Sequence, residues 1–486
     1  MNINKSRFQL SILFFSLFLN FSATLSWSQT GTDQDKKMGW WREARFGMFV
    51  HWGVYSIWGG EYHGELQRRS GAEWIMNRCK IGVSEYKLVA SGFNPIKFNA
   101  DSLVLLAKRS GMKYIVFTAK HHDGFAMFKS EASTFNIMDY TPFKRDIVGE
   151  IAAACSKHGM KLGLYYSQSQ DWVNPGGAAL RRAVWEGWAN PDSTSIDNYT
   201  LKNNGHWDYL QMRKGFDDYI HQIALPQIKE ILSNYGDIAS IWFDTPAEIT
   251  DAQATEIANE LKKYPNIIVN DRLKRPNFLG DFRTSEQKLP GEELEGVHDV
   301  ETCMTLNSSW GYKRPDTNWK SPEKVIKTLI SASSEGGNFL LNIGPQPDGL
   351  IPAGSIKVLN AVGAWMKTNG ESIYGTTKAP LAAVRWGKIA IKNRPQNREM
   401  FLYVFDMPEN GLLNLPAKIK IKEAKLIASS EKLKFTSGEN GLISISLPSG
   451  KMAKELIPVV KLTLAQSLSP VRSVQKNTKT SKIVDQ

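Results

Sequence analysis

The stretch Lys113-Tyr-Ile-Val-Phe-Thr-Ala-Lys-His-His-Asp-Gly124 runs from an unbroken apolar segment into two histidines and a carboxylate. Four other apolar segments also end in polar side chains that are capable of chemistry. These endings are His51, Tyr165, Asp244 and Arg272. Short apolar segments of this kind are typical of buried strands in a parallel sheet. Because parallel strands point in one direction, their polar ends are expected to meet on one face of the fold, where barrels carry their active sites.

The segments between these strands have the pattern of amphipathic helices. Strands are predicted at 46–51, 113–119, 161–167, 238–244, 266–270 and 338–343, and helices at 100–110, 145–158, 209–235, 252–263 and 322–334. Asp101 and Ser102 are expected to cap the first of these helices, and Gly159 is expected to end the second. Buried strands that alternate with helices predict crossover connections, and therefore an α/β fold with a (β/α)8-like barrel.

The pattern changes near Lys378. From there, short alternating runs at 388–392, 400–405, 418–427 and 442–447 are separated by turn residues, with no long helical pattern between them. This predicts a small C-terminal antiparallel β-sandwich over residues 378–466, after a catalytic barrel over residues 38–377. Residues 467–486 are rich in Ser, Lys, Thr and Gln, and are expected to form a disordered tail.

The N-terminus has the layout of a secretory signal. Lys5 and Arg7 precede an apolar run from Leu10 to Phe21, and small and polar residues follow it. The run is shorter than the roughly 20 apolar residues of a membrane span. Residues 1–28 are therefore predicted to be a cleaved signal peptide, with an uncleaved anchor as the alternative. The mature protein is expected to be secreted or periplasmic, without a membrane span.

Composition excludes two classes of protein. With 42% hydrophobic and 22% charged residues, the chain resembles neither a disordered protein nor a small disulfide scaffold. Its three cysteines, Cys79, Cys155 and Cys303, lie in apolar or helical contexts, where free buried thiols are expected. Much of the net charge of +12 lies beyond residue 410, where 13 Lys or Arg accompany five Asp or Glu. No nucleic-acid-binding motif accompanies this charge, so we expect a solvated basic surface and no nucleic-acid partner.

The polar residues at the strand ends suit a polyhydroxylated ligand such as a sugar. Aromatic rings can stack on the apolar side of a sugar ring, while charged donors and acceptors bind its hydroxyls. Cleavage of a glycosidic bond needs two carboxyl groups, one at the anomeric carbon and one that protonates the leaving oxygen. Asp244 follows Ile-Trp-Phe and so emerges from an apolar strand, which makes it the candidate for the first role.

Six motifs resemble those of glycoside hydrolase family 29, the α-L-fucosidases. They are Trp41-Arg-Glu-Ala-Arg-Phe-Gly-Met-Phe-Val-His51-Trp-Gly53, Lys120-His-His-Asp-Gly-Phe125, Trp242-Phe-Asp244, Asn270-Asp-Arg272-Leu273, Glu301-Thr-Cys-Met-Thr305 with Trp310-Gly-Tyr312, and Gly336-Gly-Asn-Phe-Leu-Leu-Asn-Ile-Gly344. Together they are highly specific, and they extend from about residue 39 to residue 374. The resemblance implies a TIM barrel and an exo-acting hydrolase that releases terminal α-L-fucose from fucosylated glycans without a metal or other cofactor.

The resemblance also implies a role for each matching residue. Asp244 corresponds to the nucleophile of the family. The positions that resemble fucose-binding residues are His51, Glu73, Trp74, His121, His122, Tyr165 and Arg272. Trp310 resembles an aromatic residue that packs near the methyl group of the sugar.

The general acid/base is harder to place, because its position varies within the family. The segment Gly280-Asp-Phe-Arg-Thr-Ser-Glu286 resembles the one that usually carries it, which points to Glu286. Glu301 is the main alternative, followed by Glu293 and Asp281. A retaining mechanism predicts that the carboxyl groups of the nucleophile and the acid/base lie about 5–5.5 Å apart.

Three other functions remain open from the sequence. One is a metal-dependent hydrolase with His51, His121 and His122 as ligands, although no HxH or HExxH pattern is present. Another is a carbohydrate-binding protein without catalysis, against which the presence of Asp244 argues. A third is an enzyme acting on a sugar close to L-fucose, such as L-galactose, because an apolar pocket rejects an added hydroxyl only weakly. No feature of the sequence indicates an oligomeric state.

Overall fold

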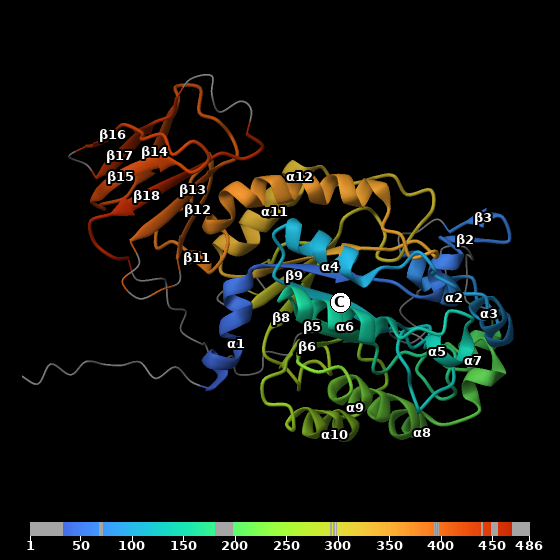
Figure 1. Cartoon of the computed structure of the whole chain (residues 1–486). Helices are drawn as coiled ribbons and strands as arrows, with labels where there is room; N and C mark the ends of the chain where they lie inside the picture. The colour runs from blue at the N-terminus through green and yellow to red at the C-terminus, as the bar shows by residue number, and fades with distance from the viewer. Residues whose placement is uncertain are drawn as a thin grey trace, which may run out of the picture.

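The computed structural model describes residues 33–468, except for 68–70, 180–197, 292–293, 295–296, 298, 393, 395, 397, 439–440 and 449–454. Figure 1 shows a barrel-like body and, beside its helices α11 and α12, a pair of small sheets formed by the C-terminal part of the chain. The predicted signal peptide at residues 1–28 lies outside the described residues, as does all but the first two residues of the predicted tail at 467–486.

Eight parallel strands form the sheet of the barrel. They are β1 (Phe46–Val50), β4 (Tyr114–Lys120), β5 (Lys161–Tyr166), β6 (Ile238–Phe243), β7 (Ile268–Val269), β8 (Arg283–Glu286), β9 (Val300–Thr305) and β10 (Asn338–Ile343). Their order in the sheet is β7-β6-β5-β4-β1-β10-β9-β8. The end strands β7 and β8 meet through a parallel bridge between Asn270 and Phe282 and a hydrogen bond from Asp281 N–H to the Val269 carbonyl (2.6 Å). The sheet therefore curls into a barrel, which is closed by the short contact between β7 and β8. This confirms the predicted fold class.

Helices connect and cover these strands. They are α1 (Asp33–Ala44), α2 (Ile75–Arg78), α3 (Val83–Ala90), α4 (Ala100–Arg109), α5 (Ile137–Tyr140), α6 (Ile147–His158), α7 (Asn198–Lys202), α8 (Phe216–Tyr219), α9 (Leu225–Ser233), α10 (Asp251–Leu261), α11 (Pro322–Ser334) and α12 (Ala353–Asn369). Asn99 caps α4, because its side chain accepts a hydrogen bond from Ser102 N–H, so the predicted cap at Asp101 and Ser102 was wrong by two to three residues. Gly159, in the left-handed region at φ 66°, ends α6.

Among the elements not predicted from the sequence are strands β8 and β9 and helices α1 and α12. Strand β8 has the sequence Arg-Thr-Ser-Glu and β9 has Val-Glu-Thr-Cys-Met-Thr, so neither shows an unbroken apolar run. Helix α12 has the sequence Ala-Gly-Ser-Ile-Lys-Val-Leu-Asn-Ala-Val-Gly-Ala-Trp-Met-Lys-Thr-Asn, in which small and polar residues interrupt the apolar face. The predicted helix at 209–235 is divided into a 3₁₀ turn at Tyr209–Met212, α8, a π-helical turn at Ile220–Ala224, and α9.

The C-terminal part of the chain forms two antiparallel sheets. One has five strands in the order β11-β12-β13-β18-β15, and the other has three in the order β14-β17-β16. Their bounds are β11 (Thr376–Lys378), β12 (Gly387–Lys392), β13 (Glu399–Val404), β14 (Leu412–Pro416), β15 (Ile421–Leu426), β16 (Phe435–Ser437), β17 (Leu442–Ser446) and β18 (Val459–Leu464). The predicted boundary between residues 377 and 378 falls inside β11.

Alternate residues of the five-stranded sheet face two different cores. Met400 and Leu402 on β13 pack with the three-stranded sheet, while Phe401 and Tyr403 on the same strand join the core of the barrel. At this contact the indole N–H of Trp365 in α12 donates to the carbonyl of Ile457 (2.8 Å). The sheets are therefore held against the side of the barrel and leave the carboxyl ends of its strands uncovered (Figure 1).

Within the ranges given above, none of the helices has the length and apolar character needed to cross a membrane.

Candidate active site

A cavity of about 270 Å³ opens where the strands of the barrel end. Its lining includes eight of the ten residues that the sequence singles out. These are His51, Glu73, Trp74, His121, Asp244, Arg272, Glu286 and Trp310. The other two, His122 and Tyr165, are buried and contact Asp244 from behind the lining. The structure therefore brings all ten residues into one site.

Asp244 directly follows β6, and both of its carboxylate oxygens are engaged. Oδ1 accepts hydrogen bonds from Nη1 of Arg272 (2.7 Å) and from the N–H of Thr245 (2.9 Å). Oδ2 accepts one from the hydroxyl of Tyr165 (3.0 Å) and lies 3.6 Å from Nε2 of His122. Donors in this arrangement stabilise the ionised carboxylate, which is the form that a nucleophile requires.

The backbone directly after Asp244 is strained. Thr245 has a φ of 42°, in the left-handed region that β-branched residues rarely adopt. Such a conformation costs about 1–3 kcal/mol and persists where its surroundings hold it. Here it directs the N–H of Thr245 towards Asp244, so part of the strain is offset by the hydrogen bond that orients the carboxylate.

Arg272 joins the two candidate catalytic carboxylates. Its Nη1 pairs with Asp244 Oδ1 at 2.7 Å, and its Nη2 pairs with Glu286 Oε2 at 3.0 Å. Its Nε donates to Thr284 (2.9 Å), and its guanidinium carbon lies 4.7 Å from the centroid of the Trp242 ring. Burial opposes the charge, but Glu286 and Asp244 outweigh it and raise the pKa of Arg272 well above its usual value. Arg272 therefore stays cationic and holds both carboxylates at one side of the cavity.

Glu286 and Glu301, the two main candidates for the acid/base, lie in different surroundings. Glu286 is the last residue of β8 and lies at the rim of the cavity, with 39% of its side chain exposed. Glu301 lies on β9 in the interior of the barrel, where it accepts hydrogen bonds from the hydroxyl of Tyr114 (2.5 Å) and the indole N–H of Trp242 (2.9 Å). Burial raises the pKa of Glu301. Glu286 faces the cavity, whereas Glu301 is outside its lining and supports Trp242 from below.

Two further candidates for the acid/base are Asp281 and Glu293, and Asp281 is not part of the cavity lining. Asp281 lies at the junction of β7 and β8, where it pairs with Lys37 (2.8 Å) and accepts a hydrogen bond from Val269 N–H (2.7 Å). Glu293 lies outside the described residues.

His51 is held in one tautomer. Asn342 donates through Nδ2 to the carbonyl of Trp310 (2.8 Å), which leaves its Oδ1 to accept from Nδ1 of His51 (2.7 Å). Burial lowers the pKa of His51 to about 4. His51 is therefore neutral at ordinary pH, and its Nε2 is left as an acceptor for a ligand hydroxyl.

The neighbouring histidines are buried as well. Nδ1 of His122 lies 2.6 Å from Oγ of Ser167, whose hydroxyl donates to the carbonyl of Gln170 (2.8 Å), so His122 donates in this pair. Burial, together with the nearby His122 and His51, lowers the pKa of His121 well below its usual value. Nδ1 of His121 is buried and has no hydrogen-bond partner in the described part of the chain.

A series of rings forms one wall of the site. The ring centroids are 5.0 Å apart between Trp310 and His51, and 5.6 Å apart between His51 and His121. His121 stacks on Tyr165 at 5.5 Å, and Tyr165 stacks on Trp242 at 5.7 Å. Such a wall suits the apolar side of a sugar ring, while Asp244 and Arg272, which contact Tyr165 and Trp242 at its end, supply polar groups.

Glu73 and Trp74 reach the site from the loop after β1. Oε2 of Glu73 accepts a hydrogen bond from the N–H of Gly311 (2.8 Å), and burial raises the pKa of this carboxyl. Trp74 lies edge-on to His122 with ring centroids 5.0 Å apart. Glu73 therefore ties this loop to the loop after β9, which carries Trp310.

Sequence reasoning missed Gln168, which is fully buried two residues after β5. Its Oε1 accepts from the N–H of Asp244 (3.1 Å), and its Nε2 donates to the carbonyls of Arg272 (2.8 Å) and Leu273 (3.1 Å). One amide thus sets the relative positions of the nucleophile candidate and its arginine. The polar run Ser167-Gln-Ser-Gln-Asp171, which follows an apolar strand, was a signal that could have identified it.

Trp242 is a further site residue that the sequence did not single out, although it belongs to the motif Trp242-Phe-Asp244. It lies two positions before Asp244 on β6, so the two side chains point to the same side of the strand. The two-residue spacing between Trp242 and Asp244 could therefore have identified Trp242 as a site residue from the sequence. Its ring lines the cavity, contacts Arg272, and donates its N–H to Glu301.

No group of three His, Cys, Asp or Glu side chains that could hold a metal ion occurs among the described residues. His51 and His122, two of the three ligands of the metal-dependent alternative, are instead engaged through Nδ1 by Asn342 and Ser167.

Comparisons with known proteins point to one family. The family model of α-L-fucosidase matches residues 19–371. The tissue α-L-fucosidase of Rattus norvegicus is 30% identical over 448 residues, covering 87% of this chain and 89% of the rat protein. The structure of α-L-fucosidase isoenzyme 1 from Paenibacillus thiaminolyticus has a TM-score of 0.75 and 31% identity, covering 89% of this chain and all of the other.

A second solved structure is chemically informative. It is a family 29 α-L-fucosidase from Bacteroides thetaiotaomicron, solved as a trapped covalent intermediate with 2-fluoro-fucosyl fluoride in a glutamate-to-glutamine mutant. Its TM-score is 0.75 at 26% identity, with 88% of this chain and 96% of that chain covered. On the evidence of its fold, its site and these relatives, this chain belongs to the α-L-fucosidase family of glycoside hydrolases.

Proposed function

We propose that this protein is an exo-acting, retaining α-L-fucosidase in which Asp244 is the nucleophile and Glu286 is the general acid/base. The observation that carries the proposal is the arrangement of the two carboxylates, which share the two terminal nitrogens of Arg272 inside one cavity. Retaining enzymes require two carboxyl groups about 5–5.5 Å apart, and a shared guanidinium keeps them close.

In the first step, an oxygen of Asp244 attacks the anomeric carbon of the bound fucoside. The bond to the leaving oxygen breaks, its electron pair stays on that oxygen, and the protonated carboxyl of Glu286 supplies the proton. The product of this step is a fucosyl ester of Asp244. Tyr165 and Arg272, which contact the carboxylate, orient it for attack.

In the second step, water attacks the same carbon while the carboxylate of Glu286 takes its proton. The ester bond breaks and its electrons return to Asp244, which restores the ionised carboxylate. The exposed position of Glu286 at the rim favours this role, because both the aglycone and the incoming water must reach it from solvent.

The remaining residues are proposed to bind the sugar. His51, His121 and Glu73 line the cavity and would offer polar groups to its hydroxyls, while Trp74 and Trp310 would offer apolar surface. His122 and Tyr165 would act on the bound sugar through Asp244, which both contact. The covalent intermediate trapped in the related enzyme of Bacteroides thetaiotaomicron supports a mechanism through an ester. Fucosylated oligosaccharides or polysaccharides are the proposed substrates.

The stereochemistry of the product tests this function. Hydrolysis of an aryl α-L-fucoside by the wild-type protein, followed by proton NMR within the first minutes, is expected to show α-L-fucose before mutarotation. β-L-Fucose as the first product would indicate an inverting enzyme and remove Asp244 from the role of nucleophile. A protein that binds fucose without turnover would support the non-catalytic alternative.

The replacement Gln168→Glu is expected to lower kcat/KM for an aryl α-L-fucoside by about 100-fold, since a small displacement of catalytic groups has effects of this size. The new carboxylate cannot donate to the carbonyls of Arg272 and Leu273, so both are expected to shift relative to Asp244. Steady-state kinetics and thermal unfolding measure the two effects.

Gln227→Glu is the matched control for this experiment. Gln227 is also fully buried, accepts from the hydroxyl of Tyr166 (2.8 Å) and donates to Ser130 (3.0 Å), away from the cavity lining. Both variants should lose stability to a similar extent, whereas kcat should fall only for Gln168→Glu. Equal losses of activity would mean that Gln168 acts through stability alone.

We also propose, from the sequence, how the chain is exported and divided into domains. Residues 1–28 would direct export to the periplasm or the medium and then be removed. The catalytic domain would span residues 38–377 and the β-sandwich residues 378–466, with residues 467–486 as a tail. N-terminal sequencing of the mature protein tests the first of these statements.

A further inference from the structure

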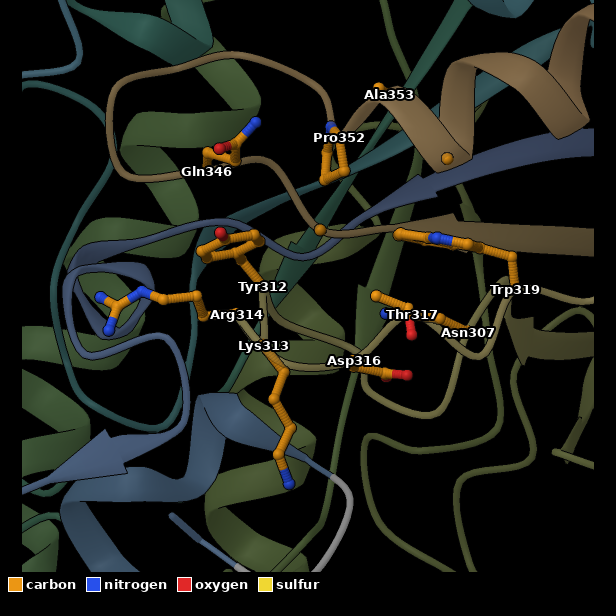
Figure 2. A pocket seen from close by; sticks show the side chains of 12 residues that line it. Asn307, Tyr312, Lys313, Arg314, Asp316, Thr317, Trp319, Gln346, Pro352 and Ala353 are labelled. Atoms are coloured by element: carbon orange, nitrogen blue, oxygen red, sulfur yellow. The ribbon is translucent and has the colours of Figure 1, made fainter. Parts of the chain in front are cut away.

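A second cavity lies next to the active site, and no step of the proposed reaction uses it. Its volume is about 170 Å³, many times what one water molecule needs. It lies between the loop after β9 and the loop after β10 that leads into α12. We call it the loop pocket and define it by Asn307, Tyr312, Asp316, Trp319, Gln346 and Pro352 (Figure 2).

Aromatic rings and free polar groups line the loop pocket. Tyr312 and Trp319 lie at opposite sides of it, with Gln346 and Pro352 along one edge (Figure 2). Within the described chain, the hydroxyl of Tyr312, the indole N–H of Trp319 and the side-chain amide of Gln346 have no hydrogen-bond partner in the protein. All three residues are half-buried. Apolar surfaces combined with a few unpaired donors and acceptors are typical of a small-ligand site.

The position of Trp319 is fixed by the backbone beside it. A Cβ atom at Gly354, in the first turn of α12, would lie 2.1 Å from Nε1 of Trp319, so the ring rests directly on the glycine. A ring held in this way loses little freedom when a ligand stacks on it, which favours binding.

Lys313 and Arg314 also line the loop pocket, but their charged ends are paired with groups outside it. Nζ of Lys313 donates to the carbonyl of Gln67 (2.6 Å), and Nη1 of Arg314 pairs with Glu61 (3.2 Å). Figure 2 shows both side chains pointing away from Trp319. The third charged residue of the lining is Asp316, whose oxygens accept from two backbone N–H groups at 2.9 and 3.1 Å. This lining suits a neutral ligand that carries hydroxyls.

The active-site cavity and the loop pocket share one wall, the loop after β9. Ser308 and Trp310 line the active-site cavity, while Asn307 and Tyr312 line the loop pocket. Trp310 and Tyr312 are two positions apart, a span of at most about 7 Å. The loop is held in place between these two residues, because Glu73 accepts from the N–H of Gly311 (2.8 Å).

The loop after β9 starts close to Glu286, the residue that would protonate the leaving group. Gln287, the residue after Glu286, contacts Thr305 through its side chain (3.3 Å), and the hydroxyl of Thr305 donates to the carbonyl of Asn307 (2.8 Å). An aglycone that takes its proton from Glu286 therefore emerges beside the loop that forms the loop pocket.

We propose that the loop pocket binds a neutral sugar unit of the substrate on the leaving-group side of the scissile bond. The ring of this unit would stack on Trp319, and its hydroxyls would be bound by Asp316, Gln346 and Tyr312. This inference rests on the proposed function, because it assigns the aglycone of the same reaction. It makes the protein an enzyme for oligosaccharides rather than for simple fucosides.

The test compares two substrates in the same variants. Trp319→Ala and, separately, Gln346→Ala are assayed on an aryl α-L-fucoside, which has no sugar aglycone, and on fucosylated oligosaccharides of two to four sugar units. Trp319→Ala is expected to lower kcat/KM for the best oligosaccharide at least tenfold, mainly through KM, and Gln346→Ala about threefold. Activity on the aryl fucoside should stay within about twofold in both.

Trp40→Ala provides the control, because Trp40 is a half-buried tryptophan on α1, at the opposite end of the barrel. It should change neither substrate preference nor the ratio of the two activities. A wild type that cleaves the aryl fucoside but none of the oligosaccharides overturns the proposal. So do equal losses on both substrates, which would mean that Trp319 only supports the loop. A wild type inactive on every substrate would instead refute the proposed function.

Discussion

Replacing Asp244 by alanine is expected to lower kcat for an aryl α-L-fucoside by about 10⁴-fold or more, because losses of this size follow removal of a covalent nucleophile. No other carboxylate among the described residues is held by Tyr165 and Arg272 at the end of β6. Arg272 keeps its contact with Glu286, so the variant should remain folded, and circular dichroism during heating verifies this. Steady-state kinetics on purified protein measures the loss.

Asp299→Ala is the matched control for Asp244→Ala. Like Asp244, Asp299 pairs with an arginine, since Arg42 donates to it at 2.8 and 2.7 Å, and its side chain is 18% exposed against 15% for Asp244. It precedes β9 and therefore lies at the amino end of the barrel. Its loss should affect stability but change kcat by no more than about twofold. Activity above 1% in Asp244→Ala would exclude Asp244 as the nucleophile.

The sequence predicted those strands of the barrel that are made of apolar residues. Strands β1, β4, β5, β6 and β10 are buried along nearly their whole length, so their apolar runs and polar endings were visible in the sequence. These endings supplied His51, Tyr165 and Asp244. Because parallel strands must end on one face, their convergence followed without any knowledge of side-chain contacts.

The strands that sequence missed are polar for a physical reason. Strand β9 carries Glu301 into the interior of the barrel, where Tyr114 and Trp242 satisfy it. A buried polar group needs partners on other strands, and its burial cannot be inferred from the periodicity of its own segment. Strand β8 has the same difficulty, since Thr284 is buried between Arg272 and Asp271.

The residues that hold the site residues in position could not be predicted from the sequence either. Gln168 and Asn342 matter because of where they stand across the barrel, 76 residues from Asp244 and 291 residues from His51 respectively. Such pairings are set by the register of neighbouring strands. The choice among acid/base candidates depended on the same information, because Glu286 and Glu301 differ in environment and not in residue type.

The replacement Glu286→Ala is expected to separate the two steps of the reaction. With a poor leaving group, such as a sugar, kcat should fall by 10²–10⁴-fold, the range for loss of a general acid. With an activated nitrophenyl leaving group, which needs no proton, the fucosyl ester of Asp244 should still form rapidly. Water then lacks a base, so the ester is expected to accumulate and to show as a burst of nitrophenol in stopped-flow measurements.

Azide should rescue Glu286→Ala, because the anion needs no general base and fits the space left by the carboxylate. It attacks the ester from the face opposite Asp244, so the product is expected to be α-L-fucosyl azide. Azide that rescues Asp244→Ala would instead displace the leaving group directly and give the β anomer. The two variants thus yield opposite anomers only if Asp244 is the nucleophile and Glu286 the acid/base. Near-normal turnover of an oligosaccharide by Glu286→Ala would contradict this assignment and direct attention to Glu293 and Glu73, since Glu301 is held inside the barrel.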